Sequence, residues 1–163
     1  QACVDELAKE GMRTLSQMEA LELLLAKPGV YTQRQPDERE LKDMNFGLEM
    51  ACAIGGLDIG QTVVVKDGAV MAVEAIEGTD ACILRGGQLA RGGAVVAKAA
   101  KPQQDQRYDV PTVGPDTIQT MIKVGATAIV MEAGKTFLFD AKATAALADE
   151  NGIAIVAKSL EAN

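Results

Sequence analysis

The chain contains no histidine and no tryptophan, and aromatic residues make up only 3% of its 163 residues. The absence of histidine excludes a Ser-His-Asp triad, a Cys-His pair and any imidazole-ligated zinc site within this chain. Acid or base catalysis would therefore depend on carboxylates or lysines. A core so poor in aromatics must be filled by Val, Ile, Leu, Ala and Met, which is typical of an α/β interior.

Cysteine is scarce as well. The chain has three cysteines, Cys3, Cys52 and Cys82. Their number is odd, they lie far apart in the sequence and they lack the C-x-x-C spacing of many metal and redox sites. They therefore predict neither a disulfide framework nor a zinc site. Reduced thiols in a cytosolic protein are the natural interpretation.

Long apolar runs and an excess of basic residues are also missing. No stretch approaches the roughly 20 apolar residues that span a bilayer, and no charged-then-apolar leader opens the chain. We therefore expect a cytoplasmic protein, and peripheral contact with the inner membrane stays open. Sixteen basic and 23 acidic residues give a net charge of −7, which opposes binding to nucleic acid. Assembly into a homodimer also stays open.

Strand and helix patterns alternate along most of the chain. Residues 61–66 and 69–76 are β-branched runs on either side of Asp67-Gly68, a pair that favours a two-residue hairpin turn. Asp37 is placed to cap a long helix ending at Gly55-Gly56, with Leu41, Met44, Leu48 and Cys52 as its apolar stripe. The sequence predicts an α/β fold, a mixed β-sheet with helices on both faces, which is a three-layer sandwich. Further helices are expected at 2–10, 18–26, 80–85, 115–124 and 141–150. The helix at 80–85 is expected to continue loosely through the glycine-rich residues 86–93. Further strands are expected at 12–15, 94–99, 127–131, 153–157 and 136–139, the last as a hairpin-like return.

The Lys27-Pro28-Gly29 break indicates a boundary between two parts of the chain. Residues 1–27 are interpreted as the tail of an upstream α/β domain together with a linker. Residues 28–163 form the main, C-terminal domain. The first residue is Gln1 rather than Met, which indicates a processed or truncated piece.

Three carboxylates gather where the strand after Asp67-Gly68 ends and a helix begins. They are Glu74, Glu77 and Asp80, and the ends of strands are where open α/β sheets build their sites. Glu74 has apolar neighbours, so it needs a partner, which could be a base, a backbone donor or a metal. One interpretation is structural, with Thr79 or Asp80 capping the helix and Glu74 in a buried salt bridge. The other is a Mg²⁺ site with Asp80 and Glu74 as ligands beside phosphate oxygens.

Basic residues follow downstream and could receive phosphates. Lys98 interrupts an apolar strand, so it either faces a cleft or pairs with an acid such as Glu74. In an extended chain Asp105, Arg107 and Asp109 point to one side, although a solvated charged loop accounts for them equally well. The remaining candidates for substrate contact are Thr79, Arg85, Lys101 and Lys135.

The helix beginning at Pro115 offers its free N–H groups to an anion, with Asp116 and Thr117 in its first turn. Asp116 could instead satisfy those donors itself. Gly134-Lys135-Thr136 is similar to the end of a phosphate-binding P-loop, but position 129 is Ile rather than Gly and a strand follows. That motif is therefore rejected.

Several motifs in order resemble one family, the two-domain UDP-2,3-diacylglucosamine pyrophosphatases that differ from the calcineurin-like enzymes. The motifs lie at residues 65–68, 72–81, 100–102, 109–117 and 132–136, within a match of about 29–157. The resemblance implies an N-terminal Rossmann-like domain, a C-terminal catalytic domain, an active site between them and a Mg²⁺ cofactor. The Glu-Gly-Thr-Asp-Ala motif carries the key catalytic acid over to Asp80. The chain departs from the family pattern in the glycine-rich segment 86–93.

The resemblance implies hydrolysis of UDP-2,3-diacylglucosamine to UMP and 2,3-diacylglucosamine 1-phosphate in lipid A biosynthesis. On this hypothesis Asp80, aided by Glu77 or Glu74, binds Mg²⁺, while Lys98, Lys101 and Arg107 stabilise charge on the phosphoryl oxygens as water attacks. Catalytic roles are assigned to Asp80, Glu77 and Lys101. The substrate would be a lipid-linked UDP-sugar. The alternative is a noncatalytic nucleotide or lipid-phosphate binding module, in which the same acids form structural salt bridges.

Overall fold

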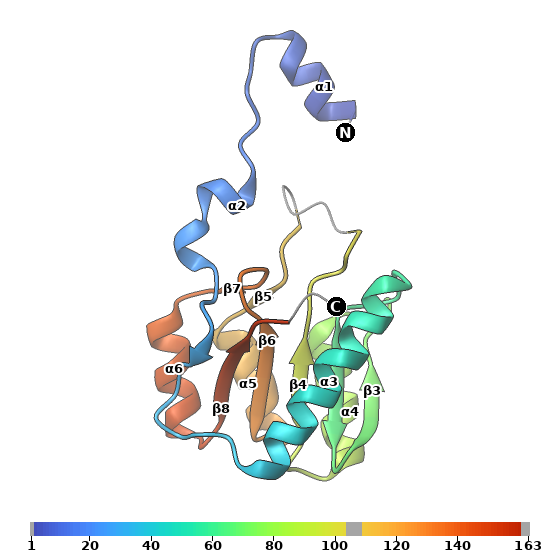
Figure 1. The fold of residues 1–163 in the computed structure, drawn as a ribbon, viewed down its shortest axis with the longest axis vertical. Coiled ribbons are helices and arrows are strands. Elements are labelled where there is room, and N and C mark those ends of the chain that lie inside the picture. The colour runs from blue at the N-terminus through green and yellow to red at the C-terminus, as the bar shows by residue number, and fades with distance from the viewer. Residues whose placement is uncertain (1, 104–108, 161–163) are drawn as a thin grey trace.

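The computed structural model describes residues 2–103 and 109–160. Its centre is a six-stranded mixed sheet with strand order β1-β8-β6-β4-β2-β3 (Figure 1). The neighbours β8, β6 and β4 run parallel, whereas β1, β2 and β3 pair antiparallel with their partners. The strands in chain order are β1 (Gly29–Val30), β2 (Thr62–Lys66), β3 (Ala69–Val73), β4 (Val95–Lys98), β6 (Ala128–Glu132) and β8 (Ala154–Lys158). A separate parallel pair is formed by β5 (Thr112–Val113) and β7 (Phe137–Leu138).

Helices cover both faces of the sheet, which confirms the predicted three-layer arrangement. One face carries α3 (Glu38–Gly56), and the other carries α4 (Thr79–Ala90), α5 (Pro115–Lys123) and α6 (Ala141–Glu150) (Figure 1). Before them come α1 (Ala2–Lys9), α2 (Gln17–Ala20) and a short 3-10 helix, η1 (Glu22–Leu24). Figure 1 shows α1 extending away from the sheet. No helix within the described ranges combines the length and hydropathy needed to cross a bilayer.

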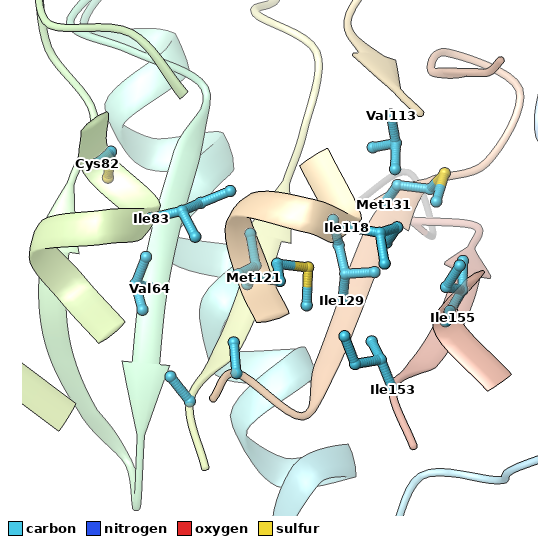
Figure 2. Close-up of a cluster of buried hydrophobic side chains, with 14 of the residues drawn as sticks. Val64, Cys82, Ile83, Val113, Ile118, Met121, Ile129, Met131, Ile153 and Ile155 are labelled. Atoms are coloured by element: carbon cyan, nitrogen blue, oxygen red, sulfur yellow. The ribbon is translucent and has the colours of Figure 1, made fainter. Parts of the chain in front are cut away.

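The alternation of side chains along the strands produces two apolar cores. Val63, Val65 and Ala97 pack toward Met44 and Leu48 of α3. The other core lies between the opposite face and α4, α5 and α6, and Figure 2 shows Ile118 and Met121 of α5 beside Ile129 of β6. Among the described residues, the buried members of both cores are non-aromatic, as the composition predicted, and the aromatic side chains that pack against their margins are those of Tyr31 and Phe46. Leu41, placed in the α3 stripe by the sequence, is instead 45% exposed, because it lies outside the face toward the sheet.

The hairpin between β2 and β3 forms around Asp67 and Gly68, both of which have positive φ. It is shorter than predicted, since β3 ends at Val73 and Ile76 lies fully exposed in the following turn. Three other expectations are wrong. Residues 12–15 form no strand, residues 18–26 give only α2 and η1, and residues 137–138 pair parallel with β5 rather than returning as a hairpin.

The glycine-rich segment after the third carboxylate continues α4 instead of loosening it. A Cβ on Gly86 would lie 2.6 Å from Cβ of Val64, and one on Gly87 would lie 2.2 Å from a methyl of Val124. These two glycines therefore let α4 approach both the sheet and the end of α5. The sequence predicts a loose segment here, but Gly86 and Gly87 lie within the helix, where they permit close packing.

The start of α3 is fixed by a buried ion pair. Asp37 caps the helix as predicted, in a capping box with Glu40, which is 1% exposed. Arg34 Nη1 donates to Glu40 Oε2 over 2.9 Å. Burial alone would raise the pKa of Glu40, but the hydrogen bonds from Arg34 and from the Asp37 N–H, together with the Thr127 hydroxyl, outweigh it and hold its pKa below its usual value.

We predict that Gly86→Ala lowers the free energy of unfolding by about 1–3 kcal/mol, because the new methyl group overpacks against Val64. Alanine's higher helix propensity, about 1 kcal/mol, offsets only part of this. The matched control is Gly56→Ala at the end of α3, where no atom lies within 4 Å of the added Cβ. Urea unfolding should show the control to be neutral or stabilised. Equal loss in both variants would contradict the packing explanation.

Glu40→Gln should lower the free energy of unfolding at pH 7 by about 2 kcal/mol, because Arg34 loses its charged partner. A carboxyl with a lowered folded pKa stabilises the protein above its ordinary pKa and loses that contribution as pH falls through the folded value. The difference in free energy of unfolding between wild type and variant should therefore shrink as the pH falls below the ordinary pKa of a glutamate. Urea unfolding at pH 7 and pH 3 tests this, with the exposed Glu38→Gln as control. A gap of equal size at both pH values would sink the assignment.

Candidate functional site

The carboxyl ends of β4, β6 and β8 meet at one edge of the sheet. The register places Lys98 opposite Thr62, at the start of β2, and beside Met131 of β6. Both α4 and α5 begin at this edge, close to Lys98. In open α/β sheets this is the edge where ligands bind.

The centre of the edge is Lys98, which is only 5% exposed. Its ammonium group donates to Thr79 Oγ1 over 3.1 Å and to the carbonyl oxygen of Thr112 over 3.0 Å. An ammonium carries three N–H donors, and the third has no acceptor among the residues that the structure describes. Lys98 can therefore donate one further hydrogen bond.

Burial lowers the pKa of Lys98, since the low-dielectric interior penalises its charge. Three carboxylates oppose that effect through their charges, namely Glu74, Asp80 and Asp109. The sequence did not group Asp109 with the other two. The structure thus brings one buried ammonium and three carboxylates into electrostatic contact.

Glu74 and Lys98 are joined through the hydroxyl of Thr79. Thr79 Oγ1 donates to Glu74 Oε1 over 3.1 Å and accepts from Lys98, and the Gln61 N–H donates to Glu74 Oε2 over 3.4 Å. Within the described residues Lys98 forms no direct ion pair with Glu74, and the two are linked only through this hydroxyl. Glu74 is 6% exposed, and both of its oxygens already accept hydrogen bonds. Its role as a metal ligand stays a prediction.

A glycine makes this arrangement possible. A Cβ on Gly60 would lie 2.0 Å from the carbonyl oxygen of Glu74, so no other residue lets the loop before β2 pass this point. The close approach brings the Gln61 N–H to the Glu74 carboxylate.

The structural alternative for the start of α4 is wrong in its details. The N-cap is Gly78, and no side chain caps the helix, so neither Thr79 nor Asp80 has that role. Thr79 turns to Lys98 and Glu74 instead. Asp80 is exposed in the first turn, and it forms no ion pair with any residue in the described part of the chain.

Glu77 and Arg85 are paired with each other. Arg85 Nη2 donates to Glu77 Oε1 and, over 2.9 Å, to the carbonyl oxygen of Val73. The hydrogen bond from Arg85 holds the pKa of Glu77 below its usual value. The catalytic role predicted for Glu77 and the substrate contact predicted for Arg85 would each have to compete with this pair, and both stay predictions.

Two other predicted lysines also have acidic partners. Lys101 Nζ lies 2.9 Å from Asp58 Oδ1, and Lys135 Nζ lies 2.7 Å from Glu132 Oε1. Glu132, which ends β6 and is 4% exposed, also accepts from the Ala100 N–H over 3.0 Å. Lys101 lies three residues after the end of β4, and its ammonium group faces Asp58 in the loop after α3.

The first turn of α5 contains Asp116, which is exposed, and Thr117, which is partly buried. The N-cap of this helix is Gly114, and no side chain caps it, so the expectation that Asp116 satisfies the free N–H groups is wrong. Neither residue accepts a hydrogen bond from Lys98, whose acceptors in the described part of the chain are Thr79 and Thr112. Arg107 and Asp105 lie outside the described residues.

The described residues contain no group of three or more His, Cys, Asp or Glu side chains that could hold a metal ion. A magnesium ion bound next to phosphates needs fewer, since one or two carboxylates and the phosphate oxygens complete its shell. Asp80 and Asp109 are exposed carboxylates that both act on Lys98, and their oxygen donors suit such an ion. This is a partial ligand set, and the magnesium site stays a prediction.

Sequence reasoning missed three contributors to the edge: Asp109, the carbonyl of Thr112 and Gly60. The sequence groups Asp109 with Asp105 and Arg107, on one side of an extended chain or in a charged loop, and gives no sign that it lies near Glu74 and Asp80. A carbonyl contact and a close backbone approach leave no signal in side-chain chemistry.

Thr79→Val should lower the free energy of unfolding by about 2 kcal/mol, because the buried Lys98 and Glu74 lose the hydroxyl that joins them. Thr79→Ser keeps that hydroxyl and should cost less than half as much. Urea unfolding of the two variants provides the comparison. If serine and valine destabilise equally, the methyl group rather than the bridge carries the effect.

Comparison with known proteins agrees with these motifs. The family model "LpxI C-terminal domain" matches residues 27–156. The chain is 38% identical over 161 residues to "UDP-2,3-diacylglucosamine pyrophosphatase LpxI" of Caulobacter vibrioides. The aligned region covers 94% of this chain and 58% of that relative, so the chain spans little more than half of the relative's length. The match includes every motif discussed above, and the chain belongs to the LpxI C-terminal domain family.

Proposed function

We propose that the chain, within its intact protein, hydrolyses the pyrophosphate bond of UDP-2,3-diacylglucosamine. The products would be UMP and 2,3-diacylglucosamine 1-phosphate, an intermediate of lipid A biosynthesis. The name of the Caulobacter vibrioides relative supports this substrate. The observation that carries the proposal is Lys98, a buried ammonium with one N–H to spare beside Asp80 and Asp109.

In the proposed reaction, Lys98 donates its third N–H to a phosphoryl oxygen and stabilises the charge that develops there. A preorganised donor in a site shielded from water is worth more than the same donor in water. The oxygen of a water molecule bonds to one phosphorus as the bond from that phosphorus to the bridging oxygen breaks. The bridging oxygen leaves on the other phosphate, and the proton of the attacking water passes to solvent. Lys101 and Arg107 would add positive charge, and Arg85, Asp116, Thr117 and Lys135 remain proposed substrate contacts.

The carboxylates would hold Mg²⁺ against the diphosphate. Asp80 and Asp109 are the proposed ligands, with Glu74 and Glu77 as the assisting acids expected from the motif. The ion supplies charge neutralisation and polarisation of the phosphoryl oxygens when it is bound. Asp80 and Asp109 would hold the ion, while the bridge from Glu74 through Thr79 orients the lysine side chain.

The setting that fits this substrate is the cytoplasmic face of the inner membrane. A lipid-linked UDP-sugar places its acyl chains in or near the bilayer, so peripheral contact is part of the proposal. We also propose that the protein assembles as a homodimer. The net charge of −7 disfavours nucleic acid as a partner.

Lys98→Met in the intact protein should lower the rate of UMP release by about 10²–10³, the effect of removing one charge-stabilising donor. Methionine fills the space without a charge, but Thr79 and the Thr112 carbonyl lose a donor, so the variant should be less stable than wild type and is assayed at a temperature at which it is folded. The matched control is Lys123→Met, an exposed lysine at the end of α5. UMP is measured by chromatography, and circular dichroism confirms folding. A folded Lys98→Met variant with wild-type turnover would exclude the proposed role.

Chelation of divalent ions should abolish UMP release, and added Mg²⁺ should restore it. Asp80→Asn and Asp109→Asn should each lower turnover by at least about tenfold and raise the Mg²⁺ concentration needed for half-maximal rate. Glu38→Gln, which changes an exposed acid in the first turn of α3 that has no role in the proposed site, is the control. If the wild-type protein binds UMP yet releases none from substrate at any metal concentration, it is a noncatalytic binding module.

A further inference from the structure

A cavity of about 340 Å³ lies next to the candidate site. One wall comes from the N-terminal segment through Leu21 and Leu24, and the facing wall comes from the end of β7 through Phe137 and Phe139. Asp109 and Thr112 border both the cavity and the site, since they also act on Lys98. Figure 1 shows β5 and β7 at the end of the sheet nearest α2.

Aromatic side chains are concentrated here to an unusual degree. The chain has three phenylalanines, and two of them line this one cavity. Phe137 is 5% exposed and supports the wall, whereas Phe139 is 57% exposed. An exposed ring at a cavity wall offers its face to a planar ligand.

The rest of the lining is mixed. Leu21, Leu24 and Val110 are apolar, while the amide of Gln17, the hydroxyl of Thr112 and the carboxylate of Asp109 are polar. A cavity for an acyl chain would need no polar groups, whereas a nucleobase needs an apolar face and polar partners at its edge. The volume lies at the lower end of the range for small-molecule sites, which suits one nucleoside rather than two acyl chains.

We propose that this cavity binds the uracil nucleoside end of the substrate, with the base stacked on Phe139. The inference rests on the proposed function for its choice of ligand. It assigns the direction of the substrate along the site: the base lies between β7 and the segment 17–24, and the diphosphate lies at Lys98. Asp109 and Thr112 stand where the two parts meet.

The test is binding of UMP to the intact protein by calorimetry. Phe139→Leu should weaken UMP binding about tenfold, because base stacking on an aromatic ring is lost, and Phe139→Tyr should keep wild-type affinity. Affinity for ribose 5-phosphate, which lacks the base, should be unchanged by Phe139→Leu. The matched control is Phe46→Leu, the third phenylalanine, which lines a separate pocket beside Asp67 and Gly68.

Three results would overturn the inference. Unchanged UMP affinity in Phe139→Leu excludes stacking on this ring. An equal loss for UMP and ribose 5-phosphate means that the ring does not contact the base. A changed preference for acyl chain length with unchanged UMP affinity assigns the cavity to the lipid. The proposed function fails separately, through absence of UMP release by the wild-type protein, and the binding test can still be carried out in that case.

Discussion

The burial of the Lys98 ammonium is the constraint on which the rest of this edge depends. Moving a charged group out of water costs several kcal/mol unless partners compensate. Here the compensation comes from the Thr79 hydroxyl, the Thr112 carbonyl and the field of three carboxylates. These partners come from the end of β3, the first turn of α4, and β5 with the residues before it, so one lysine on β4 links three other segments of the chain.

The packing of helices and loops allows these segments to come together at Lys98. The start of α4 must reach Lys98, and it does so because Gly86 and Gly87 allow the helix to lie close to Val64 and Val124. The loop before β2 must reach Glu74, and Gly60 permits that approach. Each glycine acts where another side chain would separate two elements. The polar bridge thus depends on small residues that carry no chemistry themselves.

Most of the fold could be predicted from the sequence because the core signals are local. The turn at Asp67-Gly68, the cap at Asp37 and the period of the buried strands each depend on a few neighbouring residues. The site could be predicted only in part. Sequence placed Glu74, Thr79, Asp80 and Lys98 near one another, but the pair of Glu77 with Arg85 and the approach of Asp109 depend on the distances between separate elements. The sequence predicts a loose segment over 86–93, which is wrong for 86–90 because glycines that loosen a chain and glycines that allow tight packing are alike in sequence.

The charges of this edge explain why the proposed reaction would need both a lysine and a metal ion. The protein carries a net charge of −7, and a diphosphate brings further negative charge to a site already bordered by Asp80 and Asp109. The single positive charge of Lys98 cannot neutralise both aspartates and the substrate, because it is also linked through Thr79 to the negative charge of Glu74. The uncapped first turns of α4 and α5 contribute only partial positive charge. A divalent cation between the two aspartates and the phosphates would close this deficit, and it would be bound firmly only when the substrate supplies its remaining ligands. If the ion binds in this way, the small number of carboxylate ligands among the described residues would couple metal binding to substrate binding.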